Sequence, residues 1–347
     1  MHLILDHDWT GPLPCIRAQV HPYFRRLRAT RFYNYVQRIQ VAFNLEFDEG
    51  QIHAASRAAR PDLILTVAHG PLAMVALRIS KSLKIPLVSL FHDWWPHFTS
   101  PYWPRNSEAC FLKLYRESRV AMCISEGMKI QLGPHRDSRV LLPIPGPRRP
   151  LSSLQQNGSF KIIYAGAMHG VYQAGINSLI ECTKEWCGLS FVFSGDATGW
   201  SSSKISRLSR AGIYVGNIQG ESRELDELLG AADALLVHQS FDKHQCRRVE
   251  TSFPSKIAEY SRFGKPLVAW APSASSGACW VRQNKCGIVV DDACPLKLIS
   301  AINALSENRE LIRTFGKNSI EMSETVFDPA AIQAAFLSGL KAACSRQ

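Results

Sequence analysis

Three polar side chains within one short segment have the types and the spacing to bind a phosphorylated ligand. Ser255, Lys256 and Glu259 belong to a stretch that predicts a short helix beginning near Ser255. The free amides of a first helical turn and the Lys256 ammonium favour an anion, above all a phosphate. Glu259 follows Ser255 by four residues, about 6 Å along the helix axis, where a carboxylate can accept both hydrogen bonds of a vicinal diol. Phosphate followed by diol is the order of groups in a nucleotide.

The same residues have a second interpretation, in which Lys256 and Glu259 pair with each other on an exposed helix surface. Such a pair stabilises a helix by only about 0.2–0.5 kcal/mol and performs no chemistry. The local pattern leaves both interpretations open.

The residues on either side predict how this segment is held. Ser255 has the side chain of an N-cap, and Pro254 precedes it. Gly264 can adopt the left-handed conformation that ends a helix, and Pro266 cannot continue one. The apolar residues 267–270 then predict a buried strand behind the helix.

Strand and helix patterns alternate in two series, separated by a proline-rich linker at residues 141–150. Repeated strand–helix units predict parallel sheets, so we expect two Rossmann-like, doubly wound α/β domains that face a central cleft holding the ligand. The predicted strands are 63–67, 86–91 and 119–124, then 161–165, 189–194, 213–216, 234–238, 267–270 and 287–290. The predicted helices include 71–82, 126–132 with Ser125 as its N-cap, 222–229 and 295–306.

The composition is that of a globular protein with two domains. The chain has 347 residues, of which 46% are hydrophobic and 20% charged, and no apolar run has the ~20 residues of a membrane span. The N-terminal residues lack the basic-then-apolar order of a signal peptide. Ten cysteines without a CxxC pair predict reduced core thiols and a cytoplasmic protein.

The formal net charge of +11 favours anionic partners. Basic residues gather between Arg17 and Arg38, interleaved with aromatics, and again at Arg148 and Arg149. The first cluster fits a peripheral contact with the anionic inner face of the plasma membrane, an RNA-binding arm, or an ordinary solvated helix face. Because no nucleic-acid-binding motif accompanies it, we expect no specific nucleic-acid partner.

Candidate metal ligands lack the spacing of a metal site. Asp6-His7-Asp8 stands at the chain start without preceding strands, and neither the region His238–Cys246 nor the pair Asp291-Asp292 has the spacing of a zinc site. We therefore expect neither a bound metal nor a cofactor.

The second half of the chain resembles the retaining glycosyltransferases of family 4, which have the GT-B fold of two facing Rossmann-like domains. Residues 253–260 followed by Gly264-Lys265-Pro266 resemble the donor-binding segment of the family's PSKxxEY branch. Preceding motifs occur in the family's order at 162–166, 191–196, 214–217 and 224–234. Acceptor-domain motifs occur at 61–65, 85–88, 92–93 and 124–126, and the resemblance spans roughly residues 60–325.

The resemblance implies a metal-independent, retaining hexosyltransferase of polysaccharide biosynthesis. Its substrates would be a UDP- or GDP-sugar donor and a glycan or lipid-linked acceptor. Glu259 would hold the ribose, Ser255 and Lys256 would face the diphosphate, and Gly216 and Asn217 would border the base. The other expected donor-side residues are Gly166, His169, Thr251, Phe253 and Pro254.

On the acceptor side, the resemblance implies that His92 positions the transferred sugar and that Asp93 orients His92 or touches the acceptor. Trp94 and Trp95 would form a stacking wall for a sugar ring. His92, Asp93 and Lys256 are the expected catalytic residues. The expected divisions are an acceptor domain at 1–150, a donor domain at 151–328 and a C-terminal helix at 329–347 that packs back toward the first domain.

The chain also departs from the family pattern. Thr251 stands where the first of two glutamates is usual, and Met168, His169 and Gln173 replace an Arg and a Lys after Gly166. Lys256 with Arg247 or Arg248 can supply the missing positive charge. The first 60 residues contain few glycines, which predicts an incomplete acceptor domain or an internal start at Met1.

These departures keep a second function open, namely a nucleotide-sugar-binding or partner-docking module of the same fold with impaired catalysis. A third, a nucleotide-sugar epimerase, would need catalytic carboxylates in both domains that the sequence does not identify.

Overall fold

The chain divides into two compact units in the computed structural model. Unit 1 comprises residues 1–141 and 334–347, and unit 2 comprises residues 142–333. The structure describes residues 3–5, 15–17, 49–97, 107–147, 158–186, 188–218 and 222–345. The basic residues between Arg25 and Arg38, the pair Arg148-Arg149 and the segment Asp6-His7-Asp8 lie outside the described residues.

Unit 1 is built on a parallel sheet with the strand order β3-β4-β5-β6. These strands are Ile64–Val67, Leu87–Phe91, Val120–Cys123 and Ser138–Val140, and the first three confirm predicted strands. A separate parallel pair joins β1 (Leu3–Leu5) to β2 (Cys15–Arg17). The helices of unit 1 are α3 (Glu49–Ala59), α4 (Pro71–Leu83), η1 (Trp95–His97), α5 (Ser107–Glu117) and α6 (Glu126–Leu132).

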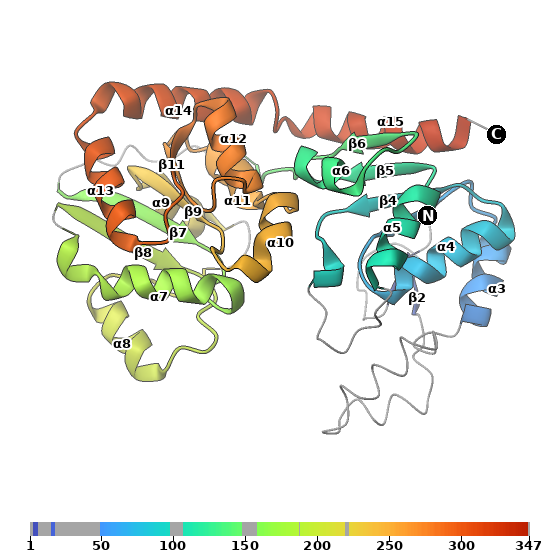
Figure 1. Ribbon diagram of the computed structural model, residues 1–347, viewed down its shortest axis with the longest axis horizontal. Coiled ribbons are helices and arrows are strands. Elements are labelled where there is room, and N and C mark those ends of the chain that lie inside the picture. The colour runs from blue at the N-terminus through green and yellow to red at the C-terminus, as the bar shows by residue number, and fades with distance from the viewer. Residues whose placement is uncertain are drawn as a thin grey trace. The chain divides into compact units, whose positions relative to one another are not determined.

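The helix α15 (Pro329–Ser345) belongs to unit 1 from Ala334 onward, and this part lies over β5 and β6 (Figure 1). Phe336, Leu340 and Ala343 pack against Val88 and Val120, and Met122 joins the same cluster. The other face of the sheet carries a larger cluster built from α4, α5, α6 and the segment after β4. Unit 1 therefore uses the last helix of the chain to complete its core.

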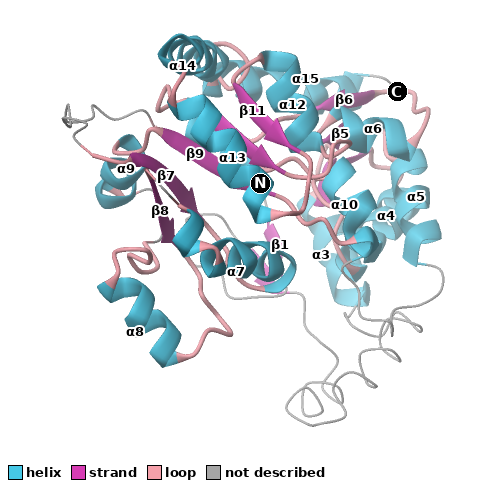
Figure 2. Cartoon of the chain, turned by 60° about the vertical axis from the view of Figure 1, so that its left-hand side comes forward, coloured by secondary structure: helices cyan, strands magenta, loops and turns pink. Residues whose placement is uncertain are grey.

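Unit 2 is a doubly wound parallel sheet with the strand order β11-β10-β9-β7-β8. Figure 2 shows helices on both sides of this sheet. The strands are β7 (Phe160–Ala165), β8 (Leu189–Ser194), β9 (Ala234–His238), β10 (Leu267–Trp270) and β11 (Gly287–Val290), all predicted. The helices are η2 (Gly170–Tyr172), α7 (Gln173–Glu181), η3 (Thr183–Glu185), α8 (Ser202–Arg210), α9 (Arg223–Gly230), η4 (Lys243–Gln245), α10 (Cys246–Thr251), α11 (Ser255–Ser261), α12 (Ser276–Asn284), α13 (Pro295–Ser306) and α14 (Arg309–Glu324).

The strand predicted at 213–216 is reduced to a single bridge between Phe193 and Tyr214. The segment still pairs with the end of β8, since Phe193 N–H donates to Ile213 O at 2.8 Å and Val215 N–H donates to Phe193 O at 3.1 Å. Gly195 N–H also donates to Gly216 O at 2.9 Å, and Gly216 then turns the chain at a φ of 96°. The prediction was wrong in length because a positive-φ turn follows at once.

The structure also tests two expectations drawn from composition, namely that the cysteines are buried thiols and that no segment spans a membrane. Eight cysteines of the described residues are free thiols, but four of them, Cys246, Cys279, Cys294 and Cys344, are exposed rather than in the core. No helix of the described residues is long and apolar enough to cross a membrane.

Candidate functional site

Two glycine turns meet at the carboxyl ends of β7 and β8. Gly166 follows β7 with a φ of 149°, and Gly195 follows β8 with a φ of 130°. A Cβ on Gly195 would overlap the backbone of Gly166, so the two turns touch through their main chains. A side chain at Gly166 would overlap the end of the Lys256 side chain. The absence of a side chain at Gly166 leaves room for the Lys256 ammonium, and its absence at Gly195 lets the two turns touch.

Lys256 comes from the first turn of α11 and is the central cation of this site. Its Nζ lies 4.9 Å from the ring centroid of Tyr164 and 5.4 Å from that of Tyr172. Among the described residues, no carboxylate lies within ion-pair distance of this ammonium. Desolvation lowers the pKa of Lys256 to about 8. A desolvated cation beside aromatic rings lacks a counter-ion, and an anionic ligand would supply one.

His238 lies beside Lys256 at the end of β9. The imidazole stacks on Trp270 at 4.6 Å, and its Nδ1 lies 3.0 Å from the Trp270 carbonyl, which assigns the donating hydrogen to Nδ1. Burial lowers the pKa of His238 to about 4, and the Lys256 charge acts in the same direction. Gly175 of α7 packs directly on the imidazole, where a Cβ would overlap it. His238 is therefore neutral and fixed in place.

Glu259 is held by contacts other than Lys256. Its Oε1 accepts a 2.7 Å hydrogen bond from Gly146 N–H, and its Oε2 lies 3.2 Å from Arg262. Arg262 is buried, binds Asp226 at 2.6 Å and donates to Pro147 O at 2.6 Å. The alternative of a Lys256–Glu259 surface pair is therefore wrong. A carboxylate has about four acceptor sites, so these contacts leave Glu259 capacity for a diol.

Several expected donor-side residues have structural roles instead. Thr251 is fully buried in α10, and its hydroxyl donates to Arg247 O at 2.7 Å, so its side chain does not face a ligand. Phe253 is buried against Trp280 and Phe327. Pro254, not Ser255, is the N-cap of α11, because Ser255 is already the first helical residue and makes no capping hydrogen bond.

The remaining donor-side positions border the glycine turns. His169 follows β7 and its Nε2 lies 3.2 Å from a carboxylate oxygen of Asp196, which follows β8. Hydrogen bonds from Thr198 are the main cause of the lowered pKa of Asp196. Gly216 has open space around it, and Asn217 is exposed. These residues are thus brought to the same edge of the sheet as Lys256.

In unit 1, the expected acceptor-side histidine also lies at a strand end. His92 follows β4, lies 3.5 Å from an Asp93 carboxylate oxygen, and stacks on His69 with ring centroids 5.9 Å apart. Desolvation is the main cause of the lowered pKa of His69. His69 follows β3, so two neighbouring parallel strands present imidazoles at their carboxyl ends.

The expected stacking wall is corrected by the structure. Trp94 and Trp95 are 1% and 4% exposed and pack on Phe111 with centroid distances of 5.1 and 6.3 Å. Their ring faces serve the core of unit 1. Two adjacent indoles in an apolar surrounding are more stable buried, since each buries a large apolar area.

Five further residues of this region were not predicted from the sequence, namely Tyr164, Tyr172, His238, Arg262 and Asp226. Tyr164 and His238 fall on buried strands where they read as core residues. The sequence contained a weak indication of the Arg262 contact, because Arg262 follows Glu259 at the i, i+3 spacing of a helical ion pair. Only tertiary packing shows that all five lie around Lys256 or Glu259.

Comparisons with solved structures assign the fold. The chain aligns with the Anabaena protein HepE (Alr3699), solved with UDP, at a TM-score of 0.64 and 18% identity over 84% of this chain and 81% of that one. It aligns with a glycosyltransferase from Rickettsia africae at a TM-score of 0.68 and 13% identity over 100% and 90% of the two chains. It aligns with the S. aureus protein MnaA, solved with UDP, at a TM-score of 0.53 and 9% identity over 88% and 86%.

No protein-family model matches the chain, and no curated protein matches it. The two parallel-sheet units and the structural neighbours together show the GT-B fold.

Proposed function

We propose that this protein is a glycosyltransferase that uses a nucleotide-diphosphate sugar as donor. The observation that carries the proposal is the Lys256 ammonium, which lies beside Gly166 without a carboxylate partner among the described residues. Ligands of open parallel sheets bind beyond the carboxyl ends of the strands, and Lys256 lies there. That two structural neighbours were solved with UDP supports a nucleotide ligand.

The donor would bind through a few residues of unit 2. Lys256 would neutralise the diphosphate and stabilise it as it leaves, while Glu259, fixed by Gly146 and Arg262, would accept hydrogen bonds from the ribose hydroxyls. Gly216 and Asn217 would border the base. His169 would add charge to the phosphate side when protonated.

In unit 1, His92 and Asp93 would position the transferred sugar and the acceptor. The proposed acceptor is a glycan or a lipid-linked sugar, the proposed transferred group is a hexose, and the proposed stereochemical outcome is retention, all three from the resemblance to family 4. We further propose that the reaction needs no metal ion and takes place in the cytoplasm, with GDP-sugars as the other candidate donors and with contact to an anionic membrane surface.

The experiment measures release of UDP or GDP from a panel of nucleotide-sugars. We expect Lys256→Met and Glu259→Gln to reduce turnover by at least about tenfold, the effect of roughly 1.4 kcal/mol of lost stabilisation. Lys297→Met on the exposed face of α13 removes the same charge elsewhere and serves as the matched control. Unchanged turnover in both site variants would sink the assignment.

A second candidate function is a nucleotide-binding module with impaired catalysis. The observation that favours it is Thr251, which is buried where the family pattern has a carboxylate facing the sugar. Calorimetry with UDP distinguishes the two functions. Binding that depends on Lys256 without any transfer or hydrolysis supports the module, whereas turnover supports the transferase.

A further inference from the structure

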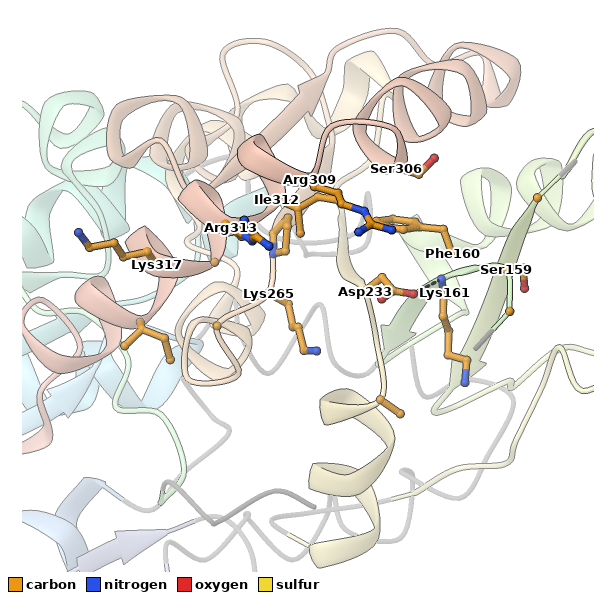
Figure 3. A pocket seen from close by; sticks show the side chains of 17 residues that line it. Ser159, Phe160, Lys161, Asp233, Lys265, Ser306, Arg309, Ile312, Arg313 and Lys317 are labelled. Atoms are coloured by element: carbon orange, nitrogen blue, oxygen red, sulfur yellow. Dashed lines mark hydrogen bonds between the residues drawn. The ribbon is translucent and has the colours of Figure 1, made fainter. Parts of the chain in front are cut away.

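A cavity of about 1030 Å³ opens at the edge of the unit 2 sheet where the strands begin. Figure 3 shows side chains that line it, which come from the starts of β7 and β9, the loop before β10, and α14. Gly166 and Lys256 belong to the opposite edge, where the strands end. The six residues of β7 separate the two edges by about 16 Å, at ~3.3 Å per residue.

Five cationic side chains line this cavity against one carboxylate. The cations are Lys161, Lys265, Arg309, Arg313 and Lys317, and the carboxylate is Asp233. One Asp233 oxygen already accepts a 2.7 Å hydrogen bond from the backbone N–H of Lys161. Within the described part of the chain, no carboxylate lies at ion-pair distance from any of the five cations. The cavity therefore has an uncompensated positive charge.

The folding of α14 does not account for its three cations. Arg309, Arg313 and Lys317 repeat at i, i+4 and i+8, which places them on one helix face, and like charges at this spacing destabilise a helix by about 0.2–0.5 kcal/mol per pair. Arg309 also lies in the first turn, where the helix dipole disfavours a cation. A bound anion would offset both effects, because it attracts the three cations and is itself favoured near a helix N-terminus.

Close backbone packing brings α14 to the Lys265 loop. Gly264 has a φ of 63°, and a Cβ on Gly316 of α14 would overlap its carbonyl, so the helix and the loop touch. Ser319 then donates a 3.0 Å hydrogen bond to Lys265 O. Lys265 is half-buried in consequence, and desolvation is the main cause of its lowered pKa. A half-buried ammonium without an ion-pair partner among the described residues is costly unless an anion joins it.

We propose that this cavity is a second ligand site of unit 2, separate from the donor site, and that it binds an anion bearing two or more phosphate charges. Its concave shape and the recessed Lys265 fit a phosphate group that enters the cavity. Such a group is offered by a soluble phosphorylated molecule or by a lipid headgroup, and both sources share the chemistry that the five cations recognise.

The test uses the full-length protein and inorganic pyrophosphate as the probe, titrated by calorimetry at low ionic strength. We expect the triple variant Arg309→Gln/Arg313→Gln/Lys317→Gln and the single variant Lys265→Gln to weaken binding by at least about tenfold. Lys256→Met should retain this pyrophosphate binding, and the cavity variants should retain UDP binding. A failed cavity proposal is thereby distinguished from a failed donor site.

A parallel arm measures co-sedimentation with phosphatidylcholine vesicles that contain or lack phosphatidic acid, whose phosphomonoester headgroup can carry two negative charges. If the cavity variants lose binding of pyrophosphate only, the natural ligand is a soluble phosphorylated molecule. If they lose binding of anionic vesicles only, the natural ligand is a lipid headgroup. Both support the site. The proposed site is wrong if the control Lys297→Gln loses as much binding as the cavity variants. It is also wrong if the wild type binds neither pyrophosphate nor the anionic vesicles.

A second measurement guards against misfolding. Removing like charges from α14 should leave the thermal midpoint of the free protein unchanged or raised. In the Lys256→Met background, which removes the proposed diphosphate contact of the donor site, pyrophosphate should raise the midpoint, and adding the three α14 substitutions should abolish that rise. A pyrophosphate-induced rise in the midpoint that survives the three α14 substitutions would contradict the proposal.

Discussion

At the scale of single residues, the Lys256 ammonium is desolvated and lies near two tyrosine rings and the neutral imidazole of His238. Desolvation disfavours the ammonium and the tyrosine rings attract it, but none of these neighbours supplies a negative charge. The residue types alone suggested a pair with Glu259, but Arg262 competes for that carboxylate and holds it. The chemistry of Lys256 is therefore decided by what surrounds it.

The lowered pKa of Lys256 predicts a pH dependence of nucleotide binding. With a pKa of about 8, the ammonium is charged below pH 8 and loses its proton as the pH rises through that value. We expect the affinity for UDP to fall between pH 7 and pH 9.5, whereas the weaker affinity of Lys256→Met shows no such fall. The measurement is a calorimetric titration at a series of pH values. Parallel pH profiles in the two proteins would contradict the assignment.

The lowered pKa of Lys256 makes the free energy of unfolding change with pH in the opposite direction to the affinity for UDP. The unfolded chain holds the lysine proton up to its ordinary pKa of 10.5, whereas the folded protein releases it near pH 8. The free energy of unfolding contributed by this group therefore rises with pH across that window. Binding and stability thus respond to pH in opposite directions, which separates a loss of affinity from unfolding.

At the scale of elements, the carboxyl ends of parallel strands gather the polar residues, and glycines set how closely the elements approach. The predicted strands were confirmed because short apolar runs bounded by glycine or proline are typical of buried parallel strands. The predictions of a full strand at 213–216 and of Ser255 as the N-cap of α11 were wrong. Both depend on local dihedral angles at Gly216 and Pro254, which residue type alone does not determine.

The contact of α7 with β9 predicts a coupling between Gly175 and His238. Alanine at an open helical position is more stable than glycine by roughly 0.5–1 kcal/mol. At Gly175 the added Cβ would overlap the imidazole, so we expect Gly175→Ala to lower the free energy of unfolding instead.

A double-mutant cycle with His238→Ala isolates this contact. Once the imidazole ring is removed, the Cβ added at position 175 has room. Gly175→Ala should then lower the free energy of unfolding by less than it does in the wild type. Chemical denaturation measures all four proteins. Strictly additive losses would show that Gly175 and His238 do not interact.

At the scale of the whole molecule, the chain builds two cores and completes the first with its last helix. The clusters of unit 1 and the large cluster of unit 2 share no residues. Residues 334–347 belong to unit 1 although all of unit 2, residues 142–333, lies between them and the rest of that unit in the sequence. The residues of the proposed donor site and of the cavity lie in unit 2, while His69 and His92 lie in unit 1.

Separate cores predict separate responses to ligand and to mutation. UDP should raise the unfolding transition of unit 2 by mass action. Leu340→Ala removes packing from β4 and β5 and should lower the transition of unit 1 by about 1–3 kcal/mol, whereas Leu337→Ala at an exposed position of α15 should change little. Differential scanning calorimetry follows both transitions. If UDP and Leu340→Ala shift the same transition, the two cores do not act independently.

The sequence by itself determined the strand–helix alternation, the two sheets and the segment 253–260 as the place to look for a ligand, because these follow from local periodicity and turn chemistry. Only the tertiary structure decided that Thr251, Phe253, Trp94 and Trp95 are core residues and that Glu259 binds Arg262. It also decided that the Lys256 side chain lies beside Gly166 and that five cationic residues line one cavity at the opposite edge of the sheet. Burial and charge depend on neighbours distant in sequence, and a local pattern does not contain them.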